Sequence, residues 1–257
     1  MPTIQPKTAK KAKNTLIIMV VLAILGGIIY LIGFSHFFDI KSWEIDEDNA
    51  KVTNDDALNN VLKNEKNKNL IFLDETQLSN QIKTLHPEFQ KIVVEKVFPQ
   101  KIVVQIEKYP IVANIVNVVQ GIQKKFLINS EGFLTDENTE NQEMPYIKVF
   151  TNDVYTVNTT VMDQDKLNYI LNAINQFQEM FSMKILNAEY YVVEREIHLQ
   201  TEKGFMVWID MQKDLMQQLN KLKKVLPKLD IYHTALDYID LRIDGTDNQK
   251  VIYKPKT

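Results

Sequence analysis

Residues able to carry out acid–base or metal chemistry form no recognised pattern in this chain. The histidines are His36, His86, His198 and His233, and we expect each to be a surface or capping residue. None stands in an H-E-x-x-H spacing, which would place two zinc ligands on one helix face. Cysteine is absent, which excludes disulfides, thiolate metal ligands and a cysteine nucleophile. Because Ser-x-x-Lys, G-x-S-x-G and P-loop motifs are also absent, we predict no catalytic, metal-binding or cofactor-binding residue.

The carboxylates do not define a site either. Asp240, Asp244 and Asp247 are close in sequence but depart from the D-x-[DN]-x-[DN]-G pattern of a calcium loop. The net charge is −3, and no basic stripe is interleaved with aromatic residues. We therefore expect neither nucleic acid nor a small-molecule substrate as a partner. Carboxylates are common, so a hydrolase with an unrecognised acidic pair stays open as an alternative.

The segment Tyr238–Gly245, YIDLRIDG, is the best candidate for a binding surface. Its alternation predicts a strand with Tyr238, Asp240 and Arg242 on one face and Ile239, Leu241 and Ile243 on the other. Asp240 and Arg242 would be same-face neighbours about 7 Å apart, from twice the rise per residue, and would form an exposed ion pair. A late strand of this kind can lie at a sheet edge, where another protein can add a strand.

An apolar run near the N-terminus decides where the rest of the chain lies. Leu16–Phe34 contains no charged residue, and a helix needs about 20 residues to cross a bilayer core of about 30 Å. Lysines precede the run, and acidic residues dominate after it. Lysines near a membrane span stay in the cytoplasm. We therefore expect a cytoplasmic tail over 1–14 and a lipid-contacting span of the cell (inner) membrane over 15–35. The rest of the chain is expected to be extracytoplasmic. A cleaved signal peptide is the alternative, although the run is longer than a usual h-region and no A-x-A-like site follows.

The residues after the span predict a small domain of strands and helices. Alternating residues predict a strand over 38–45. Thr53 resembles the start of a capping box, and a second helix is expected to begin near Asp74. Two β-branched runs, 92–98 and 102–109, predict a β-hairpin. The predicted order is strand, helix, helix, strand, strand.

The second half of the chain predicts a β-rich domain with packed helices. Apolar stripes at helical spacing predict helices over 163–181 and 213–226. Strand-like runs lie between them at 188–193, 197–201 and 205–209. The expected fold class is therefore α+β, with a single N-terminal transmembrane helix followed by two extracytoplasmic domains.

One segment carries a pattern that is typical of a known family. Val97–Ala113 reads VFPQKIVVQIEKYPIVA, with Phe98-Pro99, then Ile102, Val104 and Ile106 in alternation, then Glu107-Lys108, Pro110 and Ala113. Together with the element order, it resembles the POTRA domain of the FtsQ/DivIB bacterial cell-division family, whose pattern there is fP…l.i.v.Er.P.a. Lys108 stands where arginine is commoner. From the residues alone, the same segment is the core of a hairpin.

Later segments extend the resemblance towards the C-terminus. FLINSEGFLTD, residues 126–136, is similar to the family's lid..G.v segment, with Asn129 in place of the usual aspartate. Residues 144–147 resemble the lP.i segment of the family. YIDLR, residues 238–242, resembles its yiDlR….g signature. The resemblance therefore covers nearly the whole chain after the membrane helix.

The resemblance implies domain boundaries and a function. It places a POTRA domain (βααββ) over 36–110, a β domain over 111–245, and a C-terminal strand and tail over 246–257. A member of this family is expected to be a non-enzymatic scaffold of the bacterial divisome. It would bind other single-pass division proteins at the septum and help to control septal peptidoglycan synthesis.

Partners and contact residues also follow from the resemblance. In the family, the C-terminal end of the β domain binds the small single-pass division protein FtsB, or DivIC in Gram-positive bacteria, in complex with FtsL. Carried over by position, the partner-binding residues are Arg242, Ile243, Asp244, Gly245, Ile252 and Tyr253. Ile243 stands where some members have an aromatic residue, which changes the side-chain contact but leaves backbone pairing possible.

Three other classes of protein stay open at this stage. A membrane-anchored exported cell-envelope enzyme would need a pocket with convergent polar groups. A transport or chaperone component built from POTRA modules usually carries several of them, and the sequence shows no internal repeat. A receptor would need a signalling domain in the cytoplasm, where the expected tail of about a dozen residues leaves no room for one.

Overall fold

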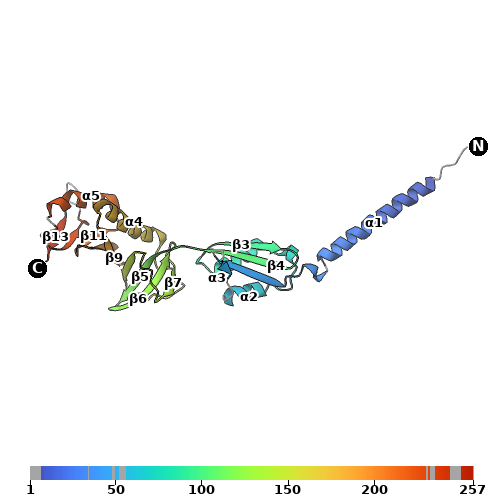
Figure 1. The fold of residues 1–257 in the computed structure, drawn as a ribbon, viewed down its shortest axis with the longest axis horizontal. Helices are drawn as coiled ribbons and strands as arrows, with labels where there is room; N and C mark the ends of the chain where they lie inside the picture. The colour runs from blue at the N-terminus through green and yellow to red at the C-terminus, as the bar shows by residue number, and fades with distance from the viewer. Residues whose placement is uncertain are drawn as a thin grey trace, which may run out of the picture. The chain divides into compact units, whose positions relative to one another are not determined.

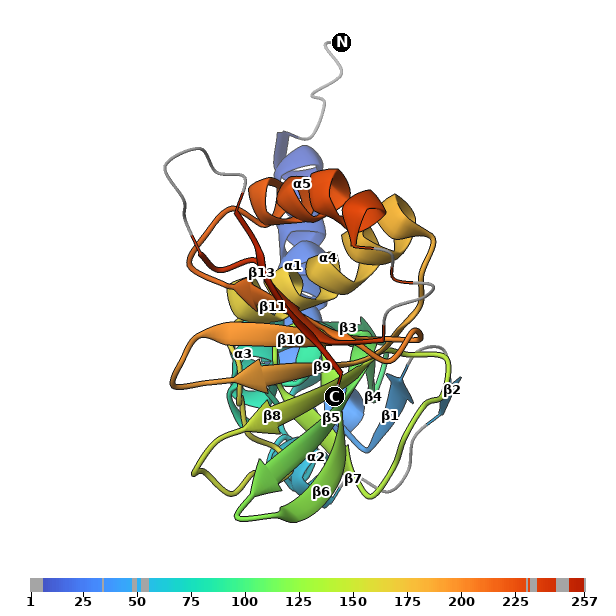
Figure 2. The same cartoon turned by 90° about the vertical axis from the view of Figure 1, so that its left-hand side faces the viewer.

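The computed structural model describes the chain over residues 7–33, 35–47, 50–51, 56–229, 231, 235–243 and 250–256. The chain forms two compact units, Met1–Lys108 and Tyr109–Thr257. Each unit has a buried apolar core of its own. Many of the elements of both units are labelled in Figure 1, and Figure 2 labels others.

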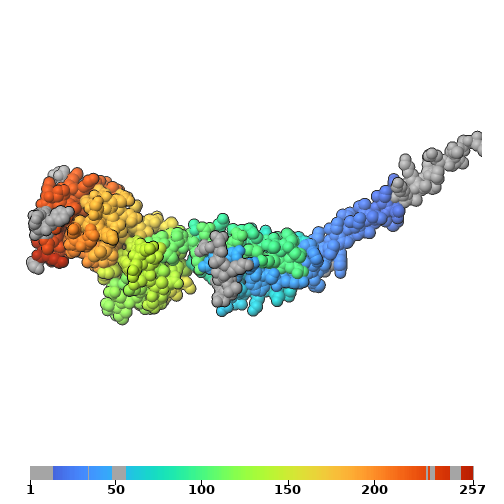
Figure 3. Space-filling view, viewed as in Figure 1, coloured from blue at the N-terminus to red at the C-terminus, as the bar shows by residue number. Residues whose placement is uncertain are grey.

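Helix α1, Lys7–Gly33, opens the first unit. Its part Asn14–Gly33 is long and apolar enough to cross a membrane, and none of that part is buried in the protein, as Figure 3 shows. A helix satisfies its backbone hydrogen bonds internally, so an uncovered apolar helix of this length is compatible with a lipid environment. The helix therefore indicates membrane anchoring.

The rest of the first unit has the predicted order of strands and helices, with one additional short strand, β2, that was not predicted. Its elements are η1 (His36–Phe38), β1 (Ser42–Glu47), β2 (Ala50–Lys51), α2 (Asp56–Lys63), η2 (Leu70–Phe72), α3 (Glu75–Leu85), β3 (Phe89–Val97) and β4 (Lys101–Lys108). The sheet has the order β2-β1-β4-β3, with β1 parallel to β4 and β3 antiparallel to β4. Strand β1 therefore lies beside β4, although the two helices and β3 separate them in sequence.

The helices of the first unit bury their apolar stripes against this sheet. Helix α3 begins where predicted, because the Asp74 side chain accepts a hydrogen bond of 2.9 Å from the Gln77 N–H. The core that joins the helices to the sheet contains Leu58, Leu62, Leu78 and Ile82 from the helices and Ile45, Ile102, Val104 and Ile106 from the strands.

The first strand begins later than the alternation predicts. In η1 the Ser35 hydroxyl accepts a hydrogen bond of 3.1 Å from the Phe37 N–H. This local bond offers the backbone an alternative to extended structure, and β1 begins only at Ser42. The expected capping residue Thr53 lies outside the described residues.

The predicted hairpin is confirmed, but its turn is not part of the core. Strands β3 and β4 pair antiparallel, and Ile102, Val104 and Ile106 are buried as their alternation predicts. Phe98 lies in the turn between them and is 57% exposed. The interpretation of the whole segment as hairpin core is therefore wrong for Phe98.

The second unit is built on one large sheet. Its strands are β5 (Ile111–Val119), β6 (Ile122–Asn129), β7 (Leu134–Glu137), β8 (Tyr146–Phe150), β9 (Ile185–Tyr191), β10 (Glu196–Thr201), β11 (Met206–Asp210), β12 (Leu236–Asp240) and β13 (Ile252–Pro255). Their order is β13-β12-β11-β10-β9-β8-β5-β6-β7. The helices are α4 (Gln164–Phe181), α5 (Leu215–Val225) and the short η3 (Leu226–Lys228).

Two parallel crossovers place both helices on the same face of this sheet. Helix α4 connects β8 to the parallel β9, and α5 connects β11 to the parallel β12. Strands β9 and β11 point the same way, because both are antiparallel to β10. Both connections also step towards β13, so right-handed crossovers must put α4 and α5 on one side. Figure 2 shows the two helices side by side, and they contact one another.

The face beneath the helices forms the core of the second unit. Apolar stripes of α4 and α5 contribute Leu167, Ile170, Ile174, Phe177, Leu219 and Leu222, and the strands contribute Ile147, Val149, Ile197, Leu199, Val207, Ile209 and Ile239. Both helices were predicted, and both begin one or two residues later than predicted, because an aspartate caps each of them. Asp163 accepts from the Lys166 N–H (2.9 Å), and Asp214 from the Gln217 N–H (2.7 Å).

We predict that Gly132→Ala destabilises the second unit strongly. Gly132 has a φ of +78°, and a Cβ there would lie 1.8 Å from the Met162 carbonyl oxygen. Gly121, with a φ of +83° and nothing within 4 Å of its Cβ position, is the matched control. Gly121→Ala should lose only the roughly 1–2 kcal/mol of the left-handed conformation, and Gly132→Ala several times more. Urea unfolding of the full chain in detergent measures both, and equal losses would contradict the steric argument.

Candidate partner-binding surface

The outermost strand of the large sheet at its C-terminal end is β13. It pairs with β12 alone among the described strands, with Ile252 opposite Asp240 and Tyr253 opposite Ile239. The side chains of Ile252 and Tyr253 are 49% and 48% exposed. Strand β12 is enclosed between β11 and β13, so the YIDLR strand itself is not an edge. Among the described strands, the edge at this end of the sheet is β13, the strand that carries the two later candidate residues.

The backbone of β13 presents Tyr253 to an added strand. The Lys256 N–H donates a hydrogen bond of 2.8 Å to the Ala235 carbonyl, towards β12. Backbone groups alternate in direction along an antiparallel strand, so those of Lys254 also face β12 and those of Tyr253 and Pro255 face outward. Proline lacks an N–H and is tolerated at such an outward position. Tyr253 is therefore the residue of β13 that offers both an outward N–H and an outward carbonyl.

The predicted alternation along β12 is confirmed. Ile239 and Leu241 are buried on the helix-covered face. Tyr238 and Asp240 lie on the opposite face, and so does Ile252, which is paired with Asp240. This opposite face carries the remaining features of the candidate surface.

Arg242 is held by several contacts within the chain. Its Nε and one terminal nitrogen donate to the two carboxylate oxygens of Asp240, at 2.9 and 2.8 Å, and its other terminal nitrogen donates to Glu196. The guanidinium also lies over the Trp208 ring, 4.7 Å from its centroid. The Asp240 side chain is only 9% exposed. The expectation of an exposed ion pair is therefore wrong: the pair is mostly buried, because strands on both sides and the Trp208 ring enclose it.

The ion pair shifts the titration of both partners. Burial by itself would raise the pKa of Asp240, but the hydrogen bonds and charge of Arg242 outweigh it and hold that pKa below its ordinary value. The hydrogen bond with Asp240 raises the pKa of Arg242, with Glu196 adding to the effect. Both groups therefore stay charged at neutral pH.

Aromatic rings form a continuous row next to Arg242, which we call the ring ladder. Its members are Phe150, Tyr191, His198, Trp208 and Tyr238, one from each strand from β8 to β12. Neighbouring centroids are 4.7, 4.5, 4.5 and 4.0 Å apart in that order. The ladder was not predicted; the alternation within each strand could have placed each ring on this face, but not side by side.

The prediction that each histidine is a surface or capping residue is confirmed only in part. His36 is exposed, and His86 caps the end of α3, as expected. His198 is buried within the ring ladder, so the expectation of a surface or capping residue is wrong for it. Its burial lowers the pKa, against the opposing effect of the Glu196 carboxylate at 3.0 Å. His233 lies outside the described residues.

The residues after β12 are fixed by lysines from the helix-covered side. Lys213 Nζ donates to the Arg242 carbonyl (2.5 Å), and Lys221 Nζ donates to the Ile243 carbonyl (3.0 Å). The Ile243 side chain is 37% exposed. Of the other predicted contact residues, Asp244 and Gly245 lie outside the described residues. The structure therefore places Arg242, Ile243, Ile252 and Tyr253 at one end of one sheet.

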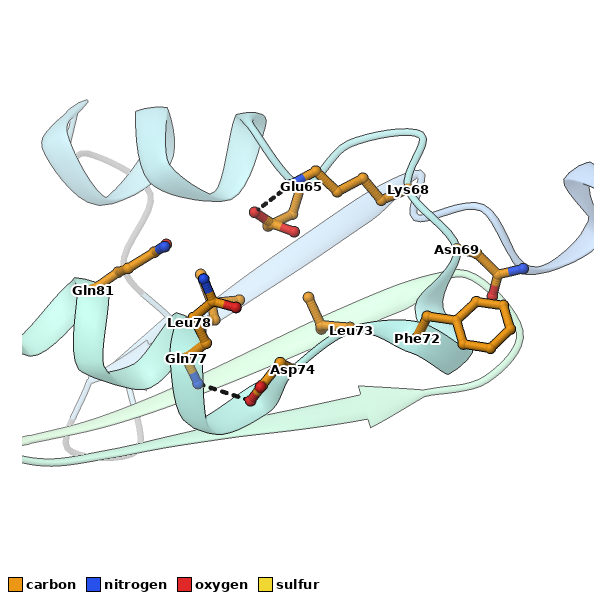
Figure 4. Close-up of a pocket in the computed structure, with 9 residues that line it drawn as sticks. All are labelled: Glu65, Lys68, Asn69, Phe72, Leu73, Asp74, Gln77, Leu78 and Gln81. Atoms are coloured by element: carbon orange, nitrogen blue, oxygen red, sulfur yellow. Dashed lines mark hydrogen bonds and ion pairs between the residues drawn. The ribbon is translucent and has the colours of Figure 1, made fainter. Parts of the chain in front are cut away.

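Hollows elsewhere do not assemble a catalytic constellation from the described residues. One of about 330 Å³ lies in the first unit and is shown in Figure 4. Its acidic side chains are engaged by neighbouring residues: Asp74 caps α3, and Glu65 pairs with Lys68 at 2.8 Å. Over the described ranges, no group of three histidine or acidic residues could hold a metal ion.

Family comparisons cover both units. Residues 38–109 match the family model of the POTRA domain, FtsQ-type, and residues 117–242 match that of the cell division protein FtsQ/DivIB, C-terminal. The chain belongs to the FtsQ/DivIB family. Members of the FtsQ/DivIB family are non-enzymatic division proteins with a scaffold role. A search of curated proteins found no match.

The family assignment confirms the predicted fold class. The chain is an α+β protein with one N-terminal apolar helix, an FtsQ-type POTRA domain and the FtsQ/DivIB C-terminal domain. The second family match ends at Arg242, so β13 lies beyond it. The strand itself was predicted, within the C-terminal segment 246–257, and the structure adds that it is the outermost strand of the sheet.

We predict that Arg242→Ala lowers the free energy of unfolding of the second unit by about 2 kcal/mol, the size of a hydrogen bond to a charged group. The variant leaves the mostly buried Asp240 without its guanidinium. Arg242→Lys should lose less, because an ammonium keeps the charge but not the two parallel hydrogen bonds. Urea unfolding followed by tryptophan fluorescence measures both. If Arg242→Ala and Arg242→Lys lost the same free energy of unfolding, the positive charge at position 242 would have no role in stability.

We also predict that His198 makes the stability depend on pH. The folded chain binds the His198 proton less readily than the unfolded chain, whose pKa is about 6.5. The contribution of His198 is therefore complete above that pKa and is lost as the pH falls below it. His198→Phe keeps a ring in the ladder without a proton to bind. The fall in unfolding free energy from about pH 7 to about pH 5 should be smaller in this variant than in the natural chain; an identical fall would refute the assignment.

Proposed function

We propose that this chain is a non-enzymatic scaffold of the bacterial divisome. It crosses the cell (inner) membrane once through α1, with its N-terminus in the cytoplasm and both other domains outside. It binds FtsB/DivIC-like and FtsL-like single-pass division proteins at the septum and so helps to control septal peptidoglycan synthesis. The family assignment supports the division role, and the lysines before the span support the orientation.

The observation that carries the partner-binding proposal is the free edge of β13. Unpaired backbone groups at a sheet edge are a template for another strand, and pockets for side chains then add specificity. Tyr253 supplies the outward N–H and carbonyl, while Ile252 and Ile243 supply exposed apolar side chains near them. Lys250 and Lys256 are exposed around the edge, while Lys254 pairs with Asp237 at 2.9 Å. The two exposed lysines favour an acidic partner strand.

Arg242 has a different role in this proposal from that of a direct contact. Its guanidinium is engaged by Asp240 and Glu196, so we propose that it fixes the end of β12, against which β13 pairs. If a substitution of Arg242 weakened partner binding, the cause could be either a lost contact with the partner or a disturbed fold of β12. Tyr253 provides the cleaner test, because its outward backbone groups take no part in the β12 pairing.

We predict that Tyr253→Pro abolishes co-purification of the full chain with its FtsB/DivIC-like partner. Proline removes the outward N–H but leaves the inward hydrogen bonds of β13 in place. Tyr253→Val is the matched control, because it also removes the ring but keeps the N–H. Valine should retain binding to a large extent. Full binding by Tyr253→Pro, with an unfolding curve like that of the natural chain, would refute strand addition at this edge.

We further predict that the chain gathers at the division site. A fluorescent protein fused to the cytoplasmic N-terminus should form a band in the host cell before constriction is complete. Uniform membrane fluorescence from a functional fusion would count against the divisome and favour the exported cell-envelope enzyme.

A further inference from the structure

Three exposed phenylalanines stand out in the first unit. Phe37, Phe72 and Phe98 are 53%, 69% and 57% exposed, whereas the apolar core between the helices and the sheet is buried. Leu85 and Val97 are also exposed in this domain, at 56% and 41%. We call these three residues the phenylalanine patch. They come from η1, η2 and the β3–β4 turn. Large apolar rings left in water are unfavourable, so their shared environment needs an explanation.

Ring contacts and a hydrogen bond bring two of these segments together. The Phe38 ring lies 5.0 Å from that of Phe37 and 6.1 Å from that of Phe98, centroid to centroid. Gln100, in the same turn, donates a hydrogen bond of 3.0 Å from its side chain to the Phe37 carbonyl. Phe37 and Phe98 therefore lie at one end of the domain.

The third segment is joined to the end of the apolar helix. Asn69 donates a hydrogen bond of 2.6 Å from its side chain to the Ile32 carbonyl, in the last turn of α1. Phe72 follows in the η2 turn that Asn69 caps. Figure 4 shows the side chains of Asn69 and Phe72 at the same end of the hollow, away from Gln81. Phe72 is therefore also at the end of the domain that meets α1.

The tether limits how far this end can be from a bilayer. Phe37 is four residues after Gly33, the last residue of α1, and four residues extend to at most about 14 Å. The polar headgroup region adds about 5–8 Å to each side of the hydrocarbon core. The tether therefore keeps Phe37 within reach of the headgroup region, where amphipathic protein surfaces insert phenylalanine rings.

We propose that the phenylalanine patch inserts into the outer-leaflet interface and docks the POTRA domain on the lipid surface. The proposal rests on α1 crossing the membrane, which is part of the proposed function. Docking would fix the orientation of the POTRA domain relative to the bilayer. Docking on lipid needs no partner protein, unlike the strand addition proposed at β13.

Nitroxide labels on single cysteines test this directly, because the natural chain has no cysteine. The full chain is reconstituted into vesicles of phosphatidylethanolamine and phosphatidylglycerol, with a label at Phe72→Cys or Phe98→Cys. Leu85→Cys is the matched control: it is also apolar and 56% exposed, but it ends α3, about 16 Å along that helix from its start beside η2. Leu25→Cys, in the middle of α1, reports the membrane span.

Collisions with oxygen and with a water-soluble nickel complex give the depth of each label. We expect the Phe72 and Phe98 labels to lose nickel collisions relative to Leu85, and the Leu25 label to lose them most. Adding Phe37→Ser and Phe98→Ser to the Phe72→Cys chain should return nickel collisions towards the Leu85 level, because the rings rather than the tether hold the label.

Three results would overturn the proposal. Labels at Phe72 and Phe98 that are as accessible to nickel as Leu85 would show a patch in water, available to a protein partner instead. An unchanged Phe72 label after the two serine substitutions would show that the tether alone sets its depth. A Leu25 label exposed to nickel would overturn the membrane span itself, and with it both the docking and the proposed topology.

Discussion

The architecture of the second unit depends on two parallel strand pairings, β8 with β9 and β11 with β12. Parallel neighbours need a crossover, and in these two pairings the crossover is a helix, whereas the parallel pair β5 and β8 is connected through β6 and β7. Because both crossovers run in the same direction along the sheet, their common handedness covers one face and leaves the other without a helix among the described residues. The same step towards β13 makes the last strand of the chain the end of the sheet.

The uncovered face determines which polar interactions are possible. Asp240 would be costly to bury alone, since an isolated charge loses its hydration. Arg242 offsets this cost with two parallel hydrogen bonds and a stacking contact on Trp208, while part of the guanidinium still reaches water. The ring ladder excludes water from the ion pair on one side. The end of β12 is thereby held in one conformation, which gives β13 a fixed strand to pair with.

In the first unit, side-chain hydrogen bonds join segments at the end of the domain that meets α1. The Asn69 side chain joins η2 to the helix end, and the Gln100 side chain joins the hairpin turn to η1. These bonds gather residues from distant parts of the sequence at the end of the domain nearest the span. The two units thus carry separate kinds of surface: an apolar one beside the membrane helix and a backbone edge at the end of the chain.

The sequence by itself determined the elements with strong local periodicity. The stripes of α3, α4 and α5, the β3–β4 hairpin and the apolar run of α1 are all local patterns, and the YIDLR signature pointed to the family. Strand β5 escaped prediction because residues 113–117 are all buried, and a strand covered on both faces loses its alternation.

Only the tertiary structure decided which strand is the edge and what Arg242 touches. Sheet order depends on how crossovers pack, and no local pattern encodes it. The residues that contact Arg242 come from β10, β11 and β12. The alternation of residues along its predicted strand could place Arg242 on one face of the sheet. That alternation could not show that Glu196 and Trp208 would contact it there. Local spacing fixes the direction of a side chain, whereas its neighbours are set by contacts between distant segments.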